Sequence, residues 1–441
     1  MIDLRRHLPQ GIWALIDKGM TGVYGFAFIF LVIARLPKEE YGLYSLVFTI
    51  ASMAMLFNKG FILFPMTKYE SEGTSQPGLL GNAFILSAVI VEAFGLLVYL
   101  AAPLAGKVFH SGALVELLRY MPLLLTAYFF RDFALCYLQA WRRVKRMVII
   151  DTIYFVGLSL AFGVLNLLGT LNKAMDMLQL YILFAIFSSL AGVILVWRDI
   201  KFDFHLRKEE LRRITGFGKF SLGMSIGELV FYQVDLLILG RFYGPLAVAQ
   251  YNAAKILFRF YSVISQSLNL LLFPGASKLS SEGRIEDLRT LYSKVIAYYW
   301  CMMLGLNAVL IAGANLIMGL VNYTESANIF RLLLLFSFFE PLYTISMVVL
   351  YGMGKPYKAF KPLLMAIPLY LGLNLLLVPY LQGMGAAITF GVNNAFLGMM
   401  LLKTLSKESG VKLNDIFRQF RRYPQVLKTV LKGGLKGVPD V

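Results

Sequence analysis

Long apolar runs recur along the whole chain, and they constrain its fold more than any other feature. Each run is about 20 residues long, which lets a helix cross about 30 Å of hydrocarbon. The 441 residues are 58% hydrophobic and 15% charged, with a mean hydropathy of +0.69. Lipid offers backbone groups no partner outside helices and closed barrels, and the runs lack the alternation of barrel strands. The sequence therefore predicts an all-α polytopic membrane protein. The predicted spans are 11–35, 41–66, 79–102, 114–140, 148–169, 177–197, 217–240, 246–273, 291–319, 327–351, 361–381 and 383–404.

Basic side chains are distributed unevenly between the two sides of these spans. The formal net charge is +17, from 42 Lys and Arg against 25 Asp and Glu. If the N-terminus is cytoplasmic, 30 of the 42 lie on the cytoplasmic side and 7 on the other. This asymmetry follows the positive-inside rule and predicts a cell inner (plasma) membrane protein with both termini in the cytoplasm. The cytoplasmic charge would contact anionic membrane lipids. It forms no patch that would indicate nucleic acid.

The sequence carries no pattern of metal, cofactor or catalytic chemistry. Cys136 and Cys301 lie within apolar spans, and His7, His110 and His205 are scattered without ligand spacing. Neither a Walker-type phosphate loop nor a nucleophile elbow occurs. The sequence therefore predicts a protein that is not an enzyme and has no cofactor.

Two distant segments resemble each other. FPMTKYESEG begins at Phe64, and FPGASKLSSEG begins at Phe273. An Arg at a span end precedes each copy, at Arg35 and Arg241, and VLNLL at residue 164 is echoed by GLNLL at residue 372. Coincidence is the alternative, because Pro at a helix end and polar loop residues are ordinary turn chemistry. Similar matches in the same order predict a duplication with parallel repeats, in which a substrate site would lie between the halves.

The repeat and the charge runs together predict the domain organisation. We expect an N-terminal lobe of six helices at residues 1–200 and a basic cytoplasmic linker at 201–216. A C-terminal lobe of six helices would follow at 217–404, and a basic cytoplasmic tail at 405–441.

Four stretches also resemble a known family. They are GFGKFSLGMSIGELVFYQVDLLILGRFYGPLAVAQYNAAKIL from Gly216, LFPGASKLSSEG, GMGKPYKAF, and NLLLVPYLQGMGAAIT from Asn374. They are similar to polysaccharide transporters of the multidrug/oligosaccharidyl-lipid/polysaccharide exporter superfamily, which include flippases of lipid-linked oligosaccharides. The resemblance covers nearly the whole chain. It implies two six-helix lobes around a central cavity that opens alternately to each side, with a polyprenyl-pyrophosphate saccharide as cargo.

Cations at membrane depth are the candidate contacts for such an anionic cargo. Lys255 and Arg259 are spaced i, i+4 on one face of the eighth span, about 13 and 19 Å from its outer end. Arg131 lies at comparable depth in the fourth span, and Lys18 lies in the first. We predict that these four side chains bind the diphosphate, since charges in hydrocarbon usually face a cavity or a partner. The alternatives are that Lys18 extends to the interface and that the others form ion pairs with Glu228, Glu92 or Glu340.

Carboxylates and prolines within the spans suggest coupling and hinge roles. Intramembrane carboxylates can carry a proton or bind Na⁺, although a structural ion pair is the alternative. The candidates are Asp17, Glu92, Glu228, Asp235 and Glu340. The candidate hinges are Pro65 and Pro274, which would end corresponding helices, and Pro341 and Pro368, which would kink or break their spans.

The sequence leaves three functions open. The first is flipping of a lipid-linked oligosaccharide, and the buried cations favour it because they suit an anionic cargo. The second is ion-coupled export of a drug or metabolite with the same architecture. The third is a scaffold for polysaccharide polymerase or assembly proteins, which the basic tail would allow.

Overall fold

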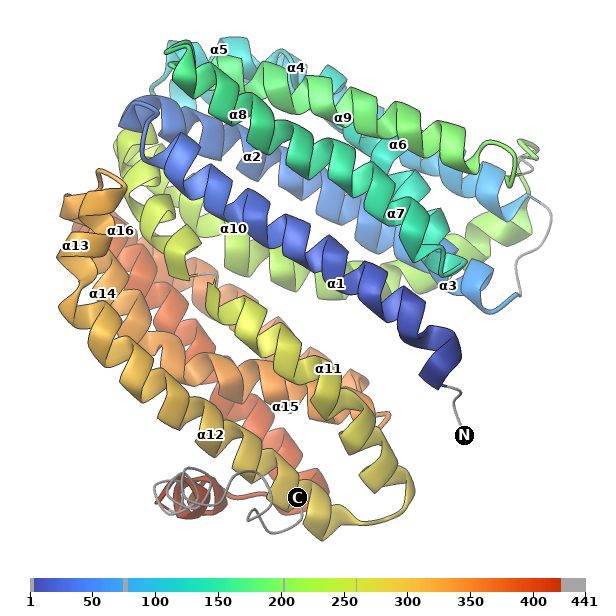
Figure 1. Cartoon of the computed structure of the whole chain (residues 1–441), viewed down its shortest axis with the longest axis vertical. Coiled ribbons are helices and arrows are strands. Elements are labelled where there is room, and N and C mark those ends of the chain that lie inside the picture. Colours follow the sequence, from blue (N-terminus) through green and yellow to red (C-terminus); the bar gives the residue numbers. More distant parts are fainter. Residues whose placement is uncertain (1–3, 74–77, 201–202, 259, 422–441) are drawn as a thin grey trace. The chain divides into compact units, whose positions relative to one another are not determined.

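The computed structural model describes residues 4–73, 78–200, 203–258 and 260–421, without the side chains of 4–12, 14, 15, 220, 224, 228, 260, 262, 263, 266, 267 and 269–271. Every regular element in the described residues is helical, as predicted (Figure 1). Up to residue 250 the elements are α1 (Leu4–Ala27), η1 (Phe28–Ile33), α2 (Lys38–Asn58), η2 (Lys59–Leu63), α3 (Phe64–Ser71), α4 (Leu79–Val108), α5 (Gly112–Leu118), α6 (Met121–Ala140), α7 (Val144–Asp151), η3 (Thr152–Val156), α8 (Gly157–Leu167), α9 (Ala174–Val196) and most of α10 (Lys208–Phe258). The later elements are α11 (Phe260–Ser281), α12 (Ile285–Ala312), α13 (Ala314–Leu320), η4 (Thr324–Ser326), α14 (Ala327–Phe336), η5 (Ser337–Phe339), α15 (Glu340–Gly352) and α16 (Tyr357–Ser409).

The helices follow the predicted membrane spans in order. Among the described residues, nine helices are long and apolar enough to cross a membrane, or ten if the bent α10 is one span. Two long helices contain corners, because Gly244 in α10 has φ +74° and Gln382 in α16 has φ +52°. Each corner lies at a boundary that the sequence predicts between two spans, 217–240 and 246–273 in the first case and 361–381 and 383–404 in the second.

By their internal contacts the residues form two compact units, 1–250 and 251–441. The first unit thus includes most of α10, and α10 begins at Lys208, within the segment expected to be a linker. The division into lobes at 1–200 and 217–404 stays a prediction, as does the cytoplasmic tail.

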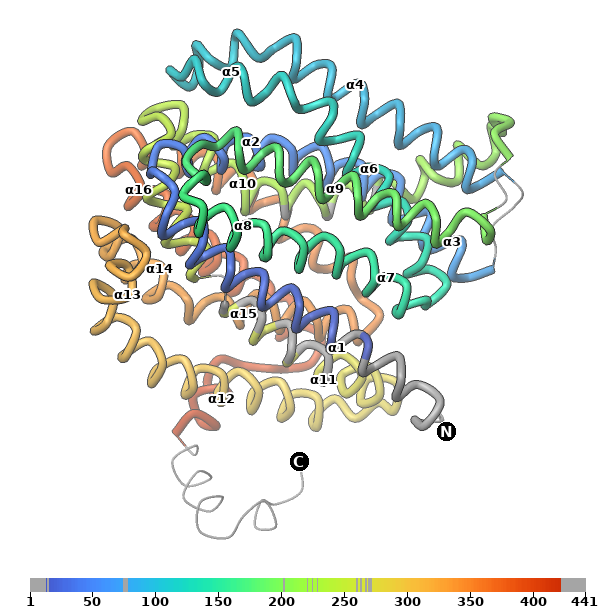
Figure 2. The backbone as a smooth tube through the Cα atoms, turned by 45° about the horizontal axis from the view of Figure 1, so that its top comes forward, coloured from blue at the N-terminus to red at the C-terminus, as the bar shows by residue number. Residues whose placement is uncertain are grey.

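Helix α6 is the central helix of the first unit. It packs against α2, α3, α4, α7 and α9, and α4 lies beside α5 (Figure 2). The fourth span begins later than the predicted residue 114, because the short helix α5 and the 20-residue helix α6 replace one long helix. Ser111 caps α5 by accepting a hydrogen bond from the Leu114 backbone N–H, and Pro122 stands in the first turn of α6. Proline fits a first helical turn because its missing N–H would have no partner there.

A close approach of two backbones fixes α2 against the corner of α10. A Cβ added at Gly42 would lie 1.8 Å from the carbonyl oxygen of Pro245. No heavy atom lies within 4 Å of the corresponding position at Gly22 in α1.

We expect Gly42→Ala to lower the stability of the protein by about 1–3 kcal/mol, because the added methyl group must push two backbones apart. The midpoint of thermal unfolding in detergent measures the effect. Gly22→Ala is the matched control and should leave the midpoint nearly unchanged. Equal midpoints for both variants would contradict the close approach.

Two of the predicted helix-ending prolines do not end their helices. The chain continues from η2 into α3 with helical dihedral angles around Pro65, and α11 runs through Pro274 to Ser281. A proline inside a membrane helix is tolerated when neighbouring helices or local π and 3₁₀ geometry compensate the lost hydrogen bond. Pro341 is in the first turn of α15 directly after the 3₁₀ turn η5, and Pro368 lies inside α16. The hinge role of all four prolines stays a prediction.

An extended segment after α9 is fixed to the start of α4. The Asn82 side chain donates to the His205 carbonyl at 3.2 Å and accepts from the Arg207 N–H at 3.2 Å. A Cβ at the neighbouring Gly81 would lie 1.9 Å from the Asp203 carbonyl oxygen. The segment that leads into α10 is therefore held against the first unit rather than hanging free.

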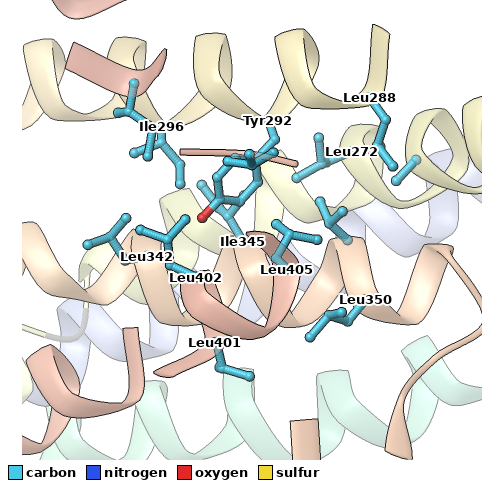
Figure 3. Close-up of a cluster of buried hydrophobic side chains, with 14 of the residues drawn as sticks. Leu272, Leu288, Tyr292, Ile296, Leu342, Ile345, Leu350, Leu401, Leu402 and Leu405 are labelled. Atoms are coloured by element: carbon cyan, nitrogen blue, oxygen red, sulfur yellow. The ribbon is translucent and has the colours of Figure 1, made fainter. Parts of the chain in front are cut away.

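The second unit has one large hydrophobic cluster, formed by α11, α12, α15, α16 and the residues after α16. Tyr292 of α12 points into it, and its hydroxyl lies 2.7 Å from Ser346 Oγ (Figure 3). Val411 and Ile416 complete the cluster and are fully buried. Arg289 of α12 clamps this tail segment through two hydrogen bonds to Asp415, at 2.7 and 2.8 Å. These contacts hold the pKa of the Asp415 carboxyl below its usual range.

Candidate functional site

The guanidinium of Arg131 is the centre of a buried polar network in the first unit. It forms an ion pair with Asp151, at the end of α7, and its Nε donates to Ser188 Oγ of α9 at 3.1 Å. It also lies over the ring of Tyr154, 4.4 Å from the ring centroid. Arg131 is 8% exposed, so the network joins α6, α7 and α9 inside the unit.

Arg131 pairs with Asp151 and, at 3.4 Å, with its neighbour Asp132, which differs from the sequence prediction. We expected an ion pair, if there was one, with Glu92, Glu228 or Glu340. Glu92 instead is exposed and accepts a hydrogen bond from Thr126 at 2.6 Å. The sequence does hold a signal for the true partner, since Asp151 interrupts the apolar run VIIDTIYFV at the start of the fifth span. An acid in such a position usually has a partner or a function.

Tyrosine side chains surround this network, which no sequence motif predicted. The hydroxyls of Tyr24 and Tyr44 both bond to that of Tyr181, and Tyr128 bonds to Tyr154. Asp17 of α1 is half-buried, interacts with Asp151, and has one carboxyl oxygen without a hydrogen-bond partner in the described structure. The first unit therefore gathers acidic and phenolic groups around one arginine.

Lys255 occupies the other buried cationic position. It lies ten residues beyond Pro245, about 15 Å along the second helix of α10. The side chain is 1% exposed, and its Nζ lies 5.5 Å and 5.6 Å from the ring centroids of Tyr251 and Phe390. These distances allow cation–π attraction, which strengthens when the charge is withdrawn from water.

The remaining predicted residues are in different settings. Lys18 is exposed on α1, and Asp235 is buried with Oδ1 2.9 Å from the Leu236 N–H. Glu340 is 9% exposed and accepts a hydrogen bond from Ser265 at 3.0 Å. Arg259 and the side chain of Glu228 lie outside the described residues. No group of three or more metal-ligating side chains occurs in the described part of the chain.

The basic loop between α6 and α7 has its own acidic partner. Arg143 and Arg146 both form ion pairs with Asp199, just after α9. The hydrogen bond from Arg146 is the main reason why the pKa of Asp199 is lowered. Some of the basic residues counted in the sequence therefore join the ends of neighbouring helices.

Comparison with known proteins identifies the family. Residues 32–326 match the family described as polysaccharide biosynthesis protein. A relative from Haloferax volcanii, named as a probable low-salt glycan biosynthesis flippase, is 24% identical over 220 residues, which are 47% of this chain and 47% of that protein.

Solved structures share the fold. The lipid II flippase MurJ in an inward closed conformation superimposes with a TM-score of 0.75 at 13% identity, covering 98% of this chain and 94% of that one. An inward-facing multidrug resistance MATE family transporter of the MOP superfamily gives a TM-score of 0.67 at 17% identity, covering 94% and 99%. The two-lobe helical architecture expected from the sequence is therefore present. The family match spans more than half of the chain, so this chain is a member of the polysaccharide biosynthesis protein family.

Proposed function

We propose that the protein flips a polyprenyl-pyrophosphate-linked oligosaccharide, a polysaccharide repeat unit, from the cytoplasmic to the outer leaflet by alternating access. The observation that carries this proposal is the fully buried Lys255, which lies in the last turn of α10 and within the eighth apolar run of the sequence. A diphosphate taken out of water needs fixed positive charge, because an unpaired charge at low dielectric costs several kcal/mol. The glycan flippase among the relatives and the family itself support a lipid-linked saccharide as the cargo.

In this proposal Lys18, Lys255 and Arg259 contact the diphosphate. Arg131 is engaged by Asp151, so it joins them only when the substrate displaces that carboxylate. The two termini lie in the cytoplasm, and the basic loops contact anionic lipids. Polysaccharide polymerase or assembly proteins are the proposed partners.

Reconstitution tests the proposal. Proteoliposomes receive a fluorescent polyprenyl-pyrophosphate oligosaccharide, and a membrane-impermeant quencher reports the fraction in the outer leaflet. We expect the protein to accelerate transfer between leaflets well above empty vesicles. Transport of a fluorescent cation such as ethidium, without transfer of the saccharide lipid, would instead support the multidrug function that the MATE fold also fits.

The orientation can be tested with single cysteines in a variant with Ser at positions 136 and 301. We expect Lys145→Cys, in the loop before α7, to resist a membrane-impermeant thiol reagent in intact cells, whereas Thr324→Cys should react. Both side chains are exposed in the structure, so access depends on the side of the membrane. Labelling of Lys145→Cys alone would reverse the proposed orientation.

A further inference from the structure

The second unit contains a buried hydrogen-bonded network that the proposed substrate contacts do not use. It joins Glu340, the first residue of α15, to Ser265 of α11 and Tyr299 of α12. Glu340 is 9% exposed, while Ser265 and Tyr299 are each 2% exposed. The network continues from Tyr261 to Asn307, whose side-chain amide donates to Ser337 Oγ at 2.8 Å.

Counting the available protons shows what the carboxyl group requires. Each hydroxyl has one proton to donate. Ser265 Oγ lies 3.0 Å from both Glu340 Oε1 and Tyr299 Oη. Tyr299 has a proton of its own, so we assign the serine proton to Oε1. Tyr299 Oη lies 3.2 Å from the Tyr261 carbonyl oxygen but 3.5 Å from Glu340 Oε2, so its proton serves the carbonyl. An ionised Glu340 would then keep Oε2 without a donor.

A proton on Oε2 resolves this shortage. The neutral acid donates through Oε2–H toward the Tyr299 oxygen, Tyr299 donates to the Tyr261 carbonyl, and Ser265 donates to Oε1. Both carboxyl oxygens of Glu340 and the hydroxyls of Ser265 and Tyr299 then each take part in a hydrogen bond with one donor and one acceptor. The ionised form would lose one hydrogen bond and leave a negative charge that no cation among the described side chains compensates, which is the costlier state.

In the described part of the chain, no charged side chain compensates Glu340. The titratable side chains that face it are Tyr299 from α12 and Tyr261 from α11. From α16, Gly398 packs against the Phe339 carbonyl and the Leu342 side chain of the same turn. Among the described side chains, no Asp, Lys, Arg or His acts on the carboxyl group.

We propose that Glu340 is a proton-binding site, whose proton is held by Tyr299 and Ser265 and is released only when α11 separates from α15. Separation would admit water to the carboxyl group, because α11 supplies both Ser265 and the Tyr261 carbonyl that engages Tyr299. Proton binding is thereby tied to the packing of one transmembrane helix on another. The link from this event to transport rests on the proposed flippase function, but proton binding itself does not.

Infrared spectroscopy of the purified full chain tests proton binding directly. We expect the C=O stretch of a protonated carboxylic acid in the wild type, shifted in D₂O and missing in Glu340→Gln. Tyr299→Phe keeps the ring but removes the proposed acceptor, so it should move the frequency of the band. If Glu340→Gln does not fold, the response to Tyr299→Phe still decides the assignment. A band unchanged in both variants, or no such band in the wild type, would overturn the proposal.

Proteoliposomes with an imposed pH difference test the link to transport. One pH unit corresponds to about tenfold for one coupled proton, so imposing a one-unit gradient should change the wild-type flipping rate by up to that order relative to no gradient. Glu340→Gln should flip at a rate that ignores the gradient, while Glu116→Gln, at an exposed position on α5, should respond like the wild type. Flipping without any gradient response would refute the coupling and leave the flippase function standing. The infrared band without any flipping would refute the function and leave the proton site standing.

Discussion

Arg131→Met is expected to destabilise the protein by about 3–5 kcal/mol, since it leaves the Asp151 carboxylate buried without its cation. The ion pairs with Asp151 and Asp132, the bond to Ser188 and the stacking on Tyr154 are lost together. The double variant Arg131→Met, Asp151→Leu should recover part of this loss, because only the Asp132 carboxylate then remains without its cation. The midpoint of thermal unfolding in detergent measures all three proteins.

Arg119→Met is the control for the loss of an arginine, because Arg119 is exposed between α5 and α6. Its effect should stay within about 0.5 kcal/mol. A stable Arg131→Met variant that no longer flips the lipid would instead give Arg131 the substrate-binding role that the sequence predicts.

Lys255→Met should reduce the flipping rate by about 30-fold or more, because truncating one side of a buried charge contact costs about 2–5 kcal/mol. The thermal midpoint should change little, and the lipid-linked saccharide should accumulate in the cytoplasmic leaflet. Arg259→Ala should have a similar effect, and Arg259→Lys should retain part of the rate since a point charge survives without the planar fork.

The control for Lys255 is Lys403→Met, which removes an exposed lysine near the end of α16. It should transport at the wild-type rate. Lys255 is a packing residue rather than a substrate contact if Lys255→Met lowers the midpoint of thermal unfolding and a second substitution restores both the midpoint and transport.

The spans of this chain were predictable because lipid imposes one requirement on every residue of a run. A long apolar segment must be a helix, whatever it packs against. Interruptions within a helix depend instead on local contacts between helices, and the sequence prediction missed these interruptions. The fourth span is interrupted near Tyr120, and three π-helical turns, such as η3 at Thr152–Val156, depend on how the helix meets its neighbours.

The candidate sites were predictable as residue types but not as contacts. The sequence singles out Arg131 and Lys255, because a cation in an apolar run stands out, and the structure buries both side chains. It did not reveal that Arg131 meets Asp151 or that Tyr299 meets Glu340. Those pairings join different helices. The spans are apolar on all sides, so their sequences do not show which face of a helix contacts which neighbour.

The burial of Val411 and Ile416 has a consequence for how the protein is made. The cluster of the second unit gathers residues from Leu272 to Ile416, so its last components follow the final transmembrane helix. Chains grow from the N-terminus, and domains generally fold as units. The ribosome must therefore have synthesised the residues up to Ile416 before this cluster can close. Until then, the apolar faces that α12 and α15 contribute to the cluster lack their contacts with Val411 and Ile416, so the final packing of the second unit comes after synthesis of its last long helix.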